Sequence, residues 1–464
     1  MAKVLEFVYD IACPYAYLAS RQVEDAARRC GATVNWLPIL LGGLYEASNA
    51  PQGKAGSATD VMAKAKQQIL ARDLSMQAQH VGVPLVHNSK HPIRTVSALR
   101  LILSAAEGLR PVVTHELFKA YWVNNCDVSD EKQLQSIANK YNLQMDALNS
   151  DAIKLQLHTN TVLQNIVYTV RFQFQLSKAR SHCGTSVKSF RKMRLAEMGA
   201  FGVPCFIVDG QFYWGQDRLF LAERALGRHD AKPRRNMRPP YNHRPHTLVY
   251  YHDFSSPWSF LAYQQVAGVA KETSAILICK PFLVGALFKS IGTPVEPLKA
   301  LTSSKASHFR KDLNDWCDYL GVKLQWPSVF PILSVRALRV ALCNEEVMRT
   351  LYCAAWIENK EIAQKSVLYE VLTKAGFDGG ALLEQAESKE IKELLRKHND
   401  EVLALGACGA PTFQILDPDG KQVALLWGQD RLNVVSDILC GWRPKSETEK
   451  GLSDPENRYP MARL

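Results

Sequence analysis

The chain has 464 residues, of which 47% are hydrophobic and 22% charged, enough apolar material for two or three globular domains. Its net charge of +11 comes from two segments, 162–194 and 228–246, so no folded basic face is expected and nucleic-acid binding is excluded. No run is apolar enough to span a membrane, and the 11 cysteines lack the paired spacing of a zinc site. We therefore expect no membrane association and no metal.

The first element is an apolar strand over residues 4–9, which is closed by Asp10. Cys13-Pro14 follows at the expected start of a helix, where a thioredoxin-like protein carries its nucleophilic thiol. A redox enzyme usually has the spacing C-x-x-C, but Ala16 occupies the second position. The turn therefore offers one thiol without a partner at the usual spacing.

The chain then repeats itself, which predicts two copies of one domain in tandem. Ser256-Pro257 corresponds to Cys13-Pro14, "GAFGVPCFIVDG" (199–210) to "GACGAPTFQILDPDG" (406–420), and "WGQDRL" occurs at Trp214 and at Trp427. In the second copy, helix-period spacing fills residues 297–405. Strands are expected at Thr247–Tyr251, Ala275–Lys280, Thr412–Leu416 and Val423–Trp427.

These patterns predict an α/β fold of two tandem thioredoxin-like domains, each with an inserted all-helical subdomain. The expected boundaries are domain 1 at 1–227, a Pro/Arg-rich linker at 228–246, domain 2 at 247–442 and a tail at 443–464. The first copy has 32 more residues between Asn160 and Gly199 than the second has between Asn399 and Gly406. This insert, about 162–194, carries seven Lys and Arg and no acid, which favours a loosely packed or non-native segment.

Three motifs, D-x-x-[SC]-P, G-x-P-x-F and W-G-Q-D-R, lie in this order around a helical insert in each copy. Together they resemble the kappa-class glutathione transferases and the 2-hydroxychromene-2-carboxylate isomerases of the DsbA-like thioredoxin superfamily. The resemblance implies glutathione as co-substrate and Ser256 as the catalytic residue that hydrogen-bonds the thiolate. Cys13 departs from the family's serine: it is expected to contact glutathione weakly, to become a thiolate itself, or to be the remnant of a decayed site.

The resemblance also implies glutathione-binding residues. Val203-Pro204 and Ala410-Pro411 are expected to form cis-proline turns that pair with the extended peptide. The "GQDR" segments are expected to hold the γ-glutamyl group at the start of the last helix of each copy, through backbone N–H groups and the two carboxylates. The residues concerned are Gln216, Asp217, Gln429 and Asp430, and Asn49 matches a further polar contact.

The leading functional hypothesis is a kappa-type glutathione transferase, acting on a small electrophile or a peroxide. The alternatives are a 2-hydroxychromene-2-carboxylate isomerase, a thiol-disulfide oxidoreductase that uses Cys13, and a degenerate first copy that only supports the second. The copies are expected to pack as an intrachain pseudo-dimer. The terminal Ala462-Arg463-Leu464 resembles a peroxisomal signal, with cytosol and mitochondrion as alternative locations.

Overall fold

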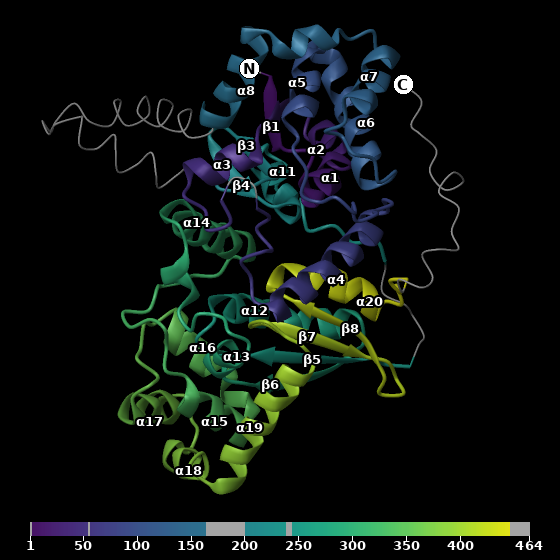
Figure 1. Cartoon of the computed structure of the whole chain (residues 1–464). Helices are drawn as coiled ribbons and strands as arrows, with labels where there is room; N and C mark the ends of the chain where they lie inside the picture. The colour runs from purple at the N-terminus through teal and green to yellow at the C-terminus, as the bar shows by residue number, and fades with distance from the viewer. Residues whose placement is uncertain (1, 54–55, 164–199, 238–243, 446–464) are drawn as a thin grey trace, which may run out of the picture.

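The computed structural model describes residues 2–53, 56–163, 200–237 and 244–445 (Figure 1). The predicted basic insert and the tail with its C-terminal signal therefore lie almost entirely outside the described residues. Within the described ranges, no helix is both long enough and apolar enough to cross a membrane.

Each copy forms one four-stranded sheet with the same topology, β2-β1-β3-β4 in the first and β6-β5-β7-β8 in the second. In the first copy, β1 runs parallel to β2 (Lys3 opposite Ala32) and antiparallel to β3, which pairs antiparallel with β4. The elements are β1 (Lys3–Tyr9), α1 (Pro14–Ser20), α2 (Val23–Arg29), β2 (Ala32–Pro38), α3 (Leu41–Ala47), α4 (Lys64–Val81), α5 (Val96–Ser104), α6 (Arg110–Trp122), α7 (Glu131–Lys140), α8 (Asp151–Leu163), β3 (Cys205–Val208), β4 (Gln211–Trp214), the 3-10 turn η3 (Gln216–Arg218) and α11 (Leu219–Ala225).

The second copy repeats this order with only small differences. The four strands predicted from the sequence are confirmed to within one residue at each end. The elements are β5 (Thr247–His252), α12 (Pro257–Glu272), β6 (Ile276–Pro281), α13 (Val284–Ser290), α14 (Ser303–Leu320), α15 (Val335–Cys343), α16 (Met348–Trp356), α17 (Lys365–Lys374), α18 (Gly379–Gln385), α19 (Lys389–Ala404), β7 (Thr412–Leu416), β8 (Gln422–Trp427), the 3-10 turn η6 (Gln429–Arg431) and α20 (Leu432–Leu439).

Strand β1 is apolar on both faces because both faces of the sheet are covered. Phe7, Val8 and Tyr9 are all fully buried, and the rings of Phe7 and Tyr9 pack edge-on against Trp36 of β2. Helices α4 to α8 are inserted between β2 and β3, and α14 to α19 occupy the same place in the second copy. The predicted fold class, two thioredoxin-like α/β domains with helical insertions, is confirmed.

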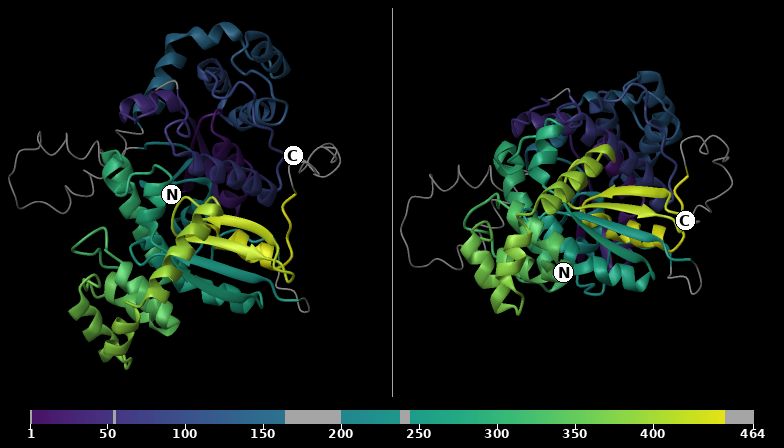
Figure 2. Two further views of the ribbon diagram at one scale, coloured as in Figure 1. Left: turned by 60° about the horizontal axis from the view of Figure 1, so that its bottom comes forward. Right: turned by 90° about the horizontal axis from the view of Figure 1, so that it is seen from below.

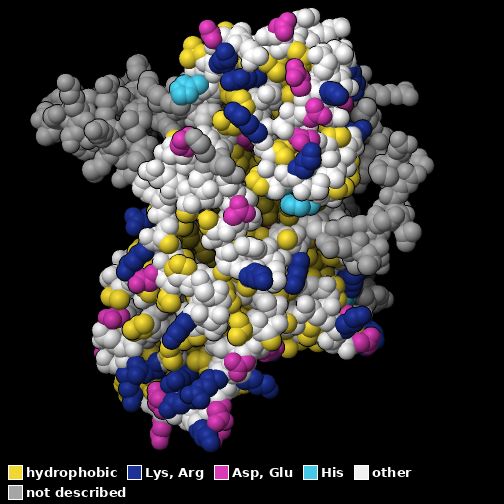
Figure 3. Space-filling model, in the orientation of Figure 1, with side chains coloured by type: hydrophobic (Ala, Val, Ile, Leu, Met, Phe, Trp, Pro, Cys, Tyr) yellow, Lys and Arg dark blue, Asp and Glu magenta, His cyan; other side chains and the backbone are white. Residues whose placement is uncertain are grey.

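The long first helix of each inserted subdomain packs on the other copy. Ile69 of α4 forms a small apolar cluster with Cys408 and Leu425, and in return His308 of α14 packs against Phe201 and other rings of the first copy. The views in Figures 1 and 2 show the two copies side by side, with α4 lying along the second sheet. Figure 3 shows hydrophobic side chains gathered in a hollow between α14 and α4.

Candidate active sites

A buried aspartate holds the turn that follows the first strand of each copy. In the second copy, Asp253 accepts hydrogen bonds from Ser255 N (2.9 Å), Val284 N (2.9 Å) and Ser334 Oγ (2.5 Å). In the first copy, Asp10 accepts from Ala12 N (3.0 Å) and Leu41 N (2.7 Å). Because one carboxylate ties the turn to two distant loops, the residue three positions later is held in a fixed place.

Ser256 lies at this fixed place, as the N-cap of α12. Its Oγ accepts a hydrogen bond from Ser259 N at 3.1 Å, which is ordinary capping, and donates to Ala410 O at 2.9 Å. Ala410 precedes the cis bond to Pro411. The hydroxyl therefore lies between a helix N-terminus and the loop whose backbone is expected to pair with a peptide.

Cys13 has the corresponding position as the N-cap of α1, but its side chain makes no cap hydrogen bond. The thiol donates instead to Val203 O at 3.1 Å. Burial raises the pKa of Cys13 to about 12, which outweighs the lowering by the N–H groups of Ala16 and Tyr15. Of the three roles left open for Cys13, the thiolate is the one that this buried position disfavours, and in this structure the thiol is a hydrogen-bond donor.

We accordingly expect Cys13 to react slowly with an alkylating agent. At neutral pH almost none of a thiol with a pKa of about 12 is ionised, and the thiolate is the nucleophile. Timed reaction of the native chain with iodoacetamide, followed by peptide mapping, should label the less buried Cys126 before Cys13. Cys13 labelling should accelerate as the pH rises toward 12, and faster labelling of Cys13 at neutral pH would contradict the assignment.

The G-x-P loop lies opposite each of these residues, and its two predicted cis bonds, Val203–Pro204 and Ala410–Pro411, are confirmed. The glycine of the motif is required by packing. A Cβ at Gly409 would lie 2.7 Å from Nε1 of Trp427, a distance that real contacts do not reach. Gly428 N then donates to Pro411 O at 3.0 Å, so the loop and the W-G-Q-D-R segment form one unit.

The "GQDR" segments are 3-10 turns that lead into α11 and α20. Gln216 Nε2 donates to Gln77 Oε1 at 3.2 Å and Gln216 Oε1 accepts from Gln22. Gln429 Oε1 accepts from Gln265 Nε2 at 3.2 Å, while its own buried Nε2 has no partner among the described residues.

Six charged side chains form a cluster where the two copies meet. Arg431 Nη1 lies 2.6 Å from Asp217 Oδ2, and Arg218 Nη1 lies 2.5 Å from Asp430 Oδ2, so each "GQDR" segment pairs with the other. Each arginine also binds a second carboxylate, from the long helix of the other copy. Asp73 of α4 lies 2.6 Å from Arg431, and Asp312 of α14 lies 2.8 Å from Arg218. Asp217 and Asp430, which the sequence assigned to glutathione alone, thus also join the two copies.

This cluster contains four carboxylates and only two guanidinium groups, and all six side chains are at most 20% exposed. Burial opposes ionisation of Asp217, but Arg218 and Arg431 outweigh it and hold its pKa at about 2. Burial raises the pKa of Asp430. The surplus of negative charge is one carboxylate per copy, and a bound cation would compensate it.

Two lysines that lie outside the sequence motifs, and that the sequence analysis did not identify, lie beside the tryptophans of W-G-Q-D-R. Lys66 Nζ of α4 is 5.2 Å from the ring centre of Trp427, and Lys305 Nζ of α14 is 5.8 Å from that of Trp214. Burial and the charge of Lys66 lower the pKa of Lys305. Among the described residues, neither ammonium group has a carboxylate partner. The sequence feature that could have identified these lysines is the equal spacing of Lys66 to Asp73 and of Lys305 to Asp312 in the two copies.

Asn49 is placed just after α3 with a φ of 49°, a left-handed conformation that asparagine adopts readily. Its side chain is exposed. Each copy thus brings together three predicted features, the N-cap residue, the G-x-P loop and the "GQDR" turn, and adds a lysine and an aspartate from the other copy. We call the set around Cys13 site one and the set around Ser256 site two.

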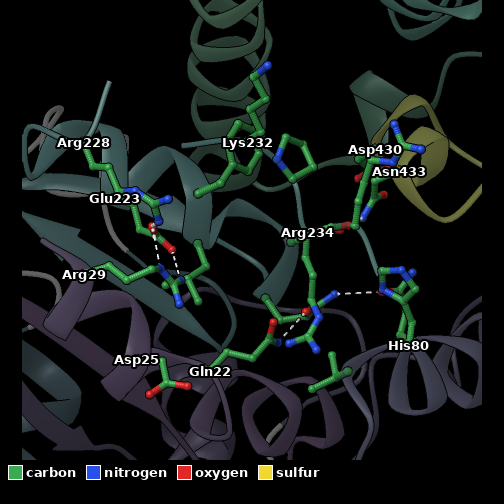
Figure 4. A pocket seen from close by; sticks show the side chains of 18 of the residues that line it. Gln22, Asp25, Arg29, His80, Glu223, Arg228, Lys232, Arg234, Asp430 and Asn433 are labelled. Carbon is green, nitrogen blue, oxygen red and sulfur yellow. Dashed lines mark hydrogen bonds and ion pairs between the residues drawn. The ribbon is translucent and has the colours of Figure 1, made fainter. Parts of the chain in front are cut away.

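A cavity of about 430 Å³ lies between the copies and the start of the linker (Figure 4). Gln216, Asp217 and Asp430 of the "GQDR" turns line it, but neither Cys13 nor Ser256 does. Its walls are largely charge pairs, such as Glu223 with Arg29 at 2.5 Å and with Arg228 at 2.6 Å. Within the described residues, no group of three or more His, Cys, Asp and Glu side chains is arranged to hold a metal ion.

The sheets, the N-cap residues and the cis-proline loops define a class, the thioredoxin-like proteins with a helical insertion. The DSBA-like thioredoxin domain matches residues 4–166 and 247–440, and the chain belongs to this family, with two tandem copies.

Relatives of about one copy's length match the chain. Glutathione S-transferase kappa 2 of Caenorhabditis elegans is 29% identical over 207 residues, which covers 42% of this chain and 91% of that protein. A 2-hydroxychromene-2-carboxylate isomerase of Sphingobium xenophagum is 26% identical over 226 residues, covering 49% and 99%. A solved 2-hydroxychromene-2-carboxylate isomerase is 22% identical, with a TM-score of 0.37 over 48% of this chain and 95% of its own.

Proposed function

We propose that the chain is a glutathione-dependent enzyme that binds one glutathione in each site and activates its thiolate in site two. The observation that carries this proposal is the Ser256 hydroxyl, 2.9 Å from Ala410 O at the N-terminus of α12. When glutathione pairs with the loop before Pro411, this hydroxyl turns from Ala410 O to the sulfur and donates to the thiolate. The helix N-terminus adds partial positive charge, which also favours ionisation of the thiol.

The charges around each site complement those of glutathione. The tripeptide carries an ammonium and a carboxylate at its γ-glutamyl end and a second carboxylate at its glycine end. The surplus carboxylate beside each "GQDR" turn suits the ammonium. Lys66 or Lys305, for which the described ranges contain no carboxylate partner, suits a carboxylate. The glutathione-linked relatives support the same ligand.

The activated thiolate then attacks a small electrophile or a peroxide, as expected of a kappa-type transferase. Glutathione-assisted isomerisation is the second candidate, because isomerases are among the relatives. A disulfide exchange centred on Cys13 is less favoured, since a thiol with a pKa of about 12 is a poor nucleophile at neutral pH. Calorimetric titration of the full chain with glutathione tests the binding step, and two equivalents per chain are expected.

Replacing Lys66 by methionine should weaken glutathione binding in site two. Loss of a hydrogen bond to a charged group costs ~1.5–3 kcal/mol, or about 10- to 100-fold in the dissociation constant. The KM for glutathione should rise accordingly while kcat changes little, because Lys66 is not expected to contact the sulfur. Lys64→Met, two positions earlier and exposed, is the matched control. Equal KM values in the two variants would exclude Lys66 from the site.

A further inference from the structure

A second loop borders each site, and the two copies of this loop share a cis peptide bond and one side-chain contact. Residues 87–94 and 326–333 each contain a cis bond before proline, His91–Pro92 and Phe330–Pro331. Ser89 N donates to Asn125 Oδ1 at 3.0 Å, and Ser328 N donates to Asn359 Oδ1 at 2.7 Å in the equivalent contact. The two loops therefore have the same position for the cis bond and the same anchoring contact to an asparagine.

The loop lies directly against the turn that carries the N-cap residue. Ile332 N donates to Ser255 Oγ at 3.1 Å, and Ser255 is the neighbour of Ser256. Trp356, whose ring centre is 5.8 Å from that of Trp326, donates from Nε1 to Phe254 O at 2.8 Å.

The first copy repeats the tryptophan contacts but not the serine contact, because Ala12 stands at the position of Ser255. Trp122 Nε1 donates to Ile11 O at 2.8 Å, and its ring centre lies 6.4 Å from that of His87 and 5.4 Å from that of His91. In each copy, the loop therefore forms a wall next to the position where a glutathione sulfur would be activated.

Four side chains of this wall differ systematically between the copies. In the second copy they are apolar: Trp326 and Phe330 are partly buried, Val329 is 53% exposed and Leu333 is 73% exposed. In the first copy the same four positions, in chain order, are His87, Lys90, His91 and Arg94.

Lys90 and Arg94 are both exposed, so the first wall carries two cationic groups where the second carries two aliphatic ones. Lys90 Nζ lies 3.0 Å from Asp127 Oδ2, a pair whose lysine side chain is 66% exposed, so solvent screens it strongly. Ser89, Pro92 and Ile93 are kept, while the four positions above, and also Asn88 against Pro327, are polar in the first copy and apolar or aromatic in the second.

The apolar wall of the second copy continues to α12, the helix that Ser256 caps. Trp258, two residues after Ser256, packs edge-on against Phe309 at 5.2 Å, and Phe309 in turn lies 6.4 Å from Trp326. The aromatic surface thus runs from the start of α12 to the loop. The first copy has Tyr15 and Leu70 at the corresponding positions of this path.

We propose that the two sites take acceptors of different charge: residues 326–333 select an uncharged, ring-bearing acceptor in site two, and residues 87–94 select an anionic acceptor in site one. The inference rests on the proposed function, because an acceptor is held next to bound glutathione in both cases. Apolar and aromatic side chains favour a desolvated ring, whereas Lys90 and Arg94 attract a carboxylate. Selection by a charge that repels the wrong ligand is a common route to specificity.

Two aryl chlorides of similar shape test this proposal, neutral 1-chloro-2,4-dinitrobenzene and anionic 4-chloro-3,5-dinitrobenzoate. In both reactions the glutathione sulfur forms a bond to the ring carbon, the carbon–chlorine bond breaks, chloride leaves, and the thiol proton passes to solvent. The measured quantities are kcat/KM for each acceptor and the dissociation constants of the two glutathione conjugates. The conjugate measurement needs no turnover, so it also reports on a site that is catalytically slow.

The variants exchange the charges between the loops of the full chain. Val329→Lys/Leu333→Arg should lower the preference for the neutral compound about three- to thirtyfold, since two exposed charges are each worth a few tenths to 1 kcal/mol. Lys90→Val/Arg94→Leu should raise that preference by a similar factor. Ile276→Lys, an exposed apolar residue on the edge strand β6, makes the same type of change away from the sites and should leave it unchanged.

Retained glutathione binding with an unaltered preference in both loop variants would overturn this inference and leave the proposed function standing. An equal shift in Ile276→Lys would overturn it too, because the effect would then be one of net charge. Absence of glutathione binding in the native chain would remove the proposed function, and the acceptor inference with it.

Discussion

Replacement of Ser256 by alanine is expected to lower glutathione-dependent turnover about 10-fold or more, since a hydrogen bond to a thiolate is worth ~1.5–3 kcal/mol. The hydroxyl now donates to Ala410 O, and in the variant no side-chain donor replaces it at the start of α12. The pKa of the bound glutathione thiol should rise, which thiolate absorbance during a pH titration of the complex measures. Because the thiolate is the reactive form, the loss should be greatest at low pH and shrink as the pH rises through that pKa.

The same substitution also removes a helix cap, and this second effect needs a control. Ser256 Oγ accepts from Ser259 N, and loss of such a cap costs about 1 kcal/mol of stability. Ser388 caps α19 in the same way, accepting from Ile391 N at 3.3 Å, and lies in the helical subdomain. Ser388→Ala should therefore lose comparable stability with unchanged turnover. A bound thiol pKa that is the same in native and Ser256→Ala protein would remove this serine from the mechanism.

Replacement of Arg431 by methionine is expected to destabilise the chain by about 3–5 kcal/mol, because it leaves buried carboxylates without their counter-ion. Arg431 lies within 2.6 Å of both Asp73 and Asp217, and its side chain is only 10% exposed. Urea denaturation followed by tryptophan fluorescence measures the loss. Since both contacts join one copy to the other, small-angle scattering should also show a larger radius of gyration, as expected if the pseudo-dimer depends on this cluster.

A surface pair provides the comparison for Arg431. Arg244 lies 2.9 Å from Asp419, but the two side chains are 69% and 75% exposed, so Arg244→Met should cost less than about 1 kcal/mol. Adding Asp73→Asn to Arg431→Met should recover part of the stability, because it removes one of the uncompensated charges. If Arg431→Met costs no more than Arg244→Met, the cluster does not hold the copies together.

At the N-cap position, the two copies differ in the group that the side chain offers: a hydroxyl in Ser256 and a thiol in Cys13. The hydroxyl both caps its helix and donates across to the loop, whereas the thiol only donates. If both sites bind glutathione as proposed, we expect the weaker donor to make site one less suited to activating it. With different walls beside them, the two sites are expected to divide acceptors rather than duplicate each other.

The sequence by itself determined the fold and the local parts of the sites. Strand β5, the cis bond before Pro411 and the N-cap position of Ser256 depend on residues close together in the chain and on motifs present twice. Local propensity, turn chemistry and repetition suffice for such features. For the same reason the G-x-P and "GQDR" segments could be identified as parts of one site.

Only the tertiary structure decided what lies around those parts. The proximity of Lys66 to Trp427, and of Arg431 to Asp73, depends on α4 crossing to the other copy, between residues more than 350 positions apart. No local pattern encodes such a contact, because it follows from how two complete domains pack. The state of Cys13 was decided in the same way. The helix N-terminus, visible in the sequence, predicts a lowered pKa, but burial by the surrounding domain raises it to about 12, since removing water penalises the thiolate more than the helix stabilises it.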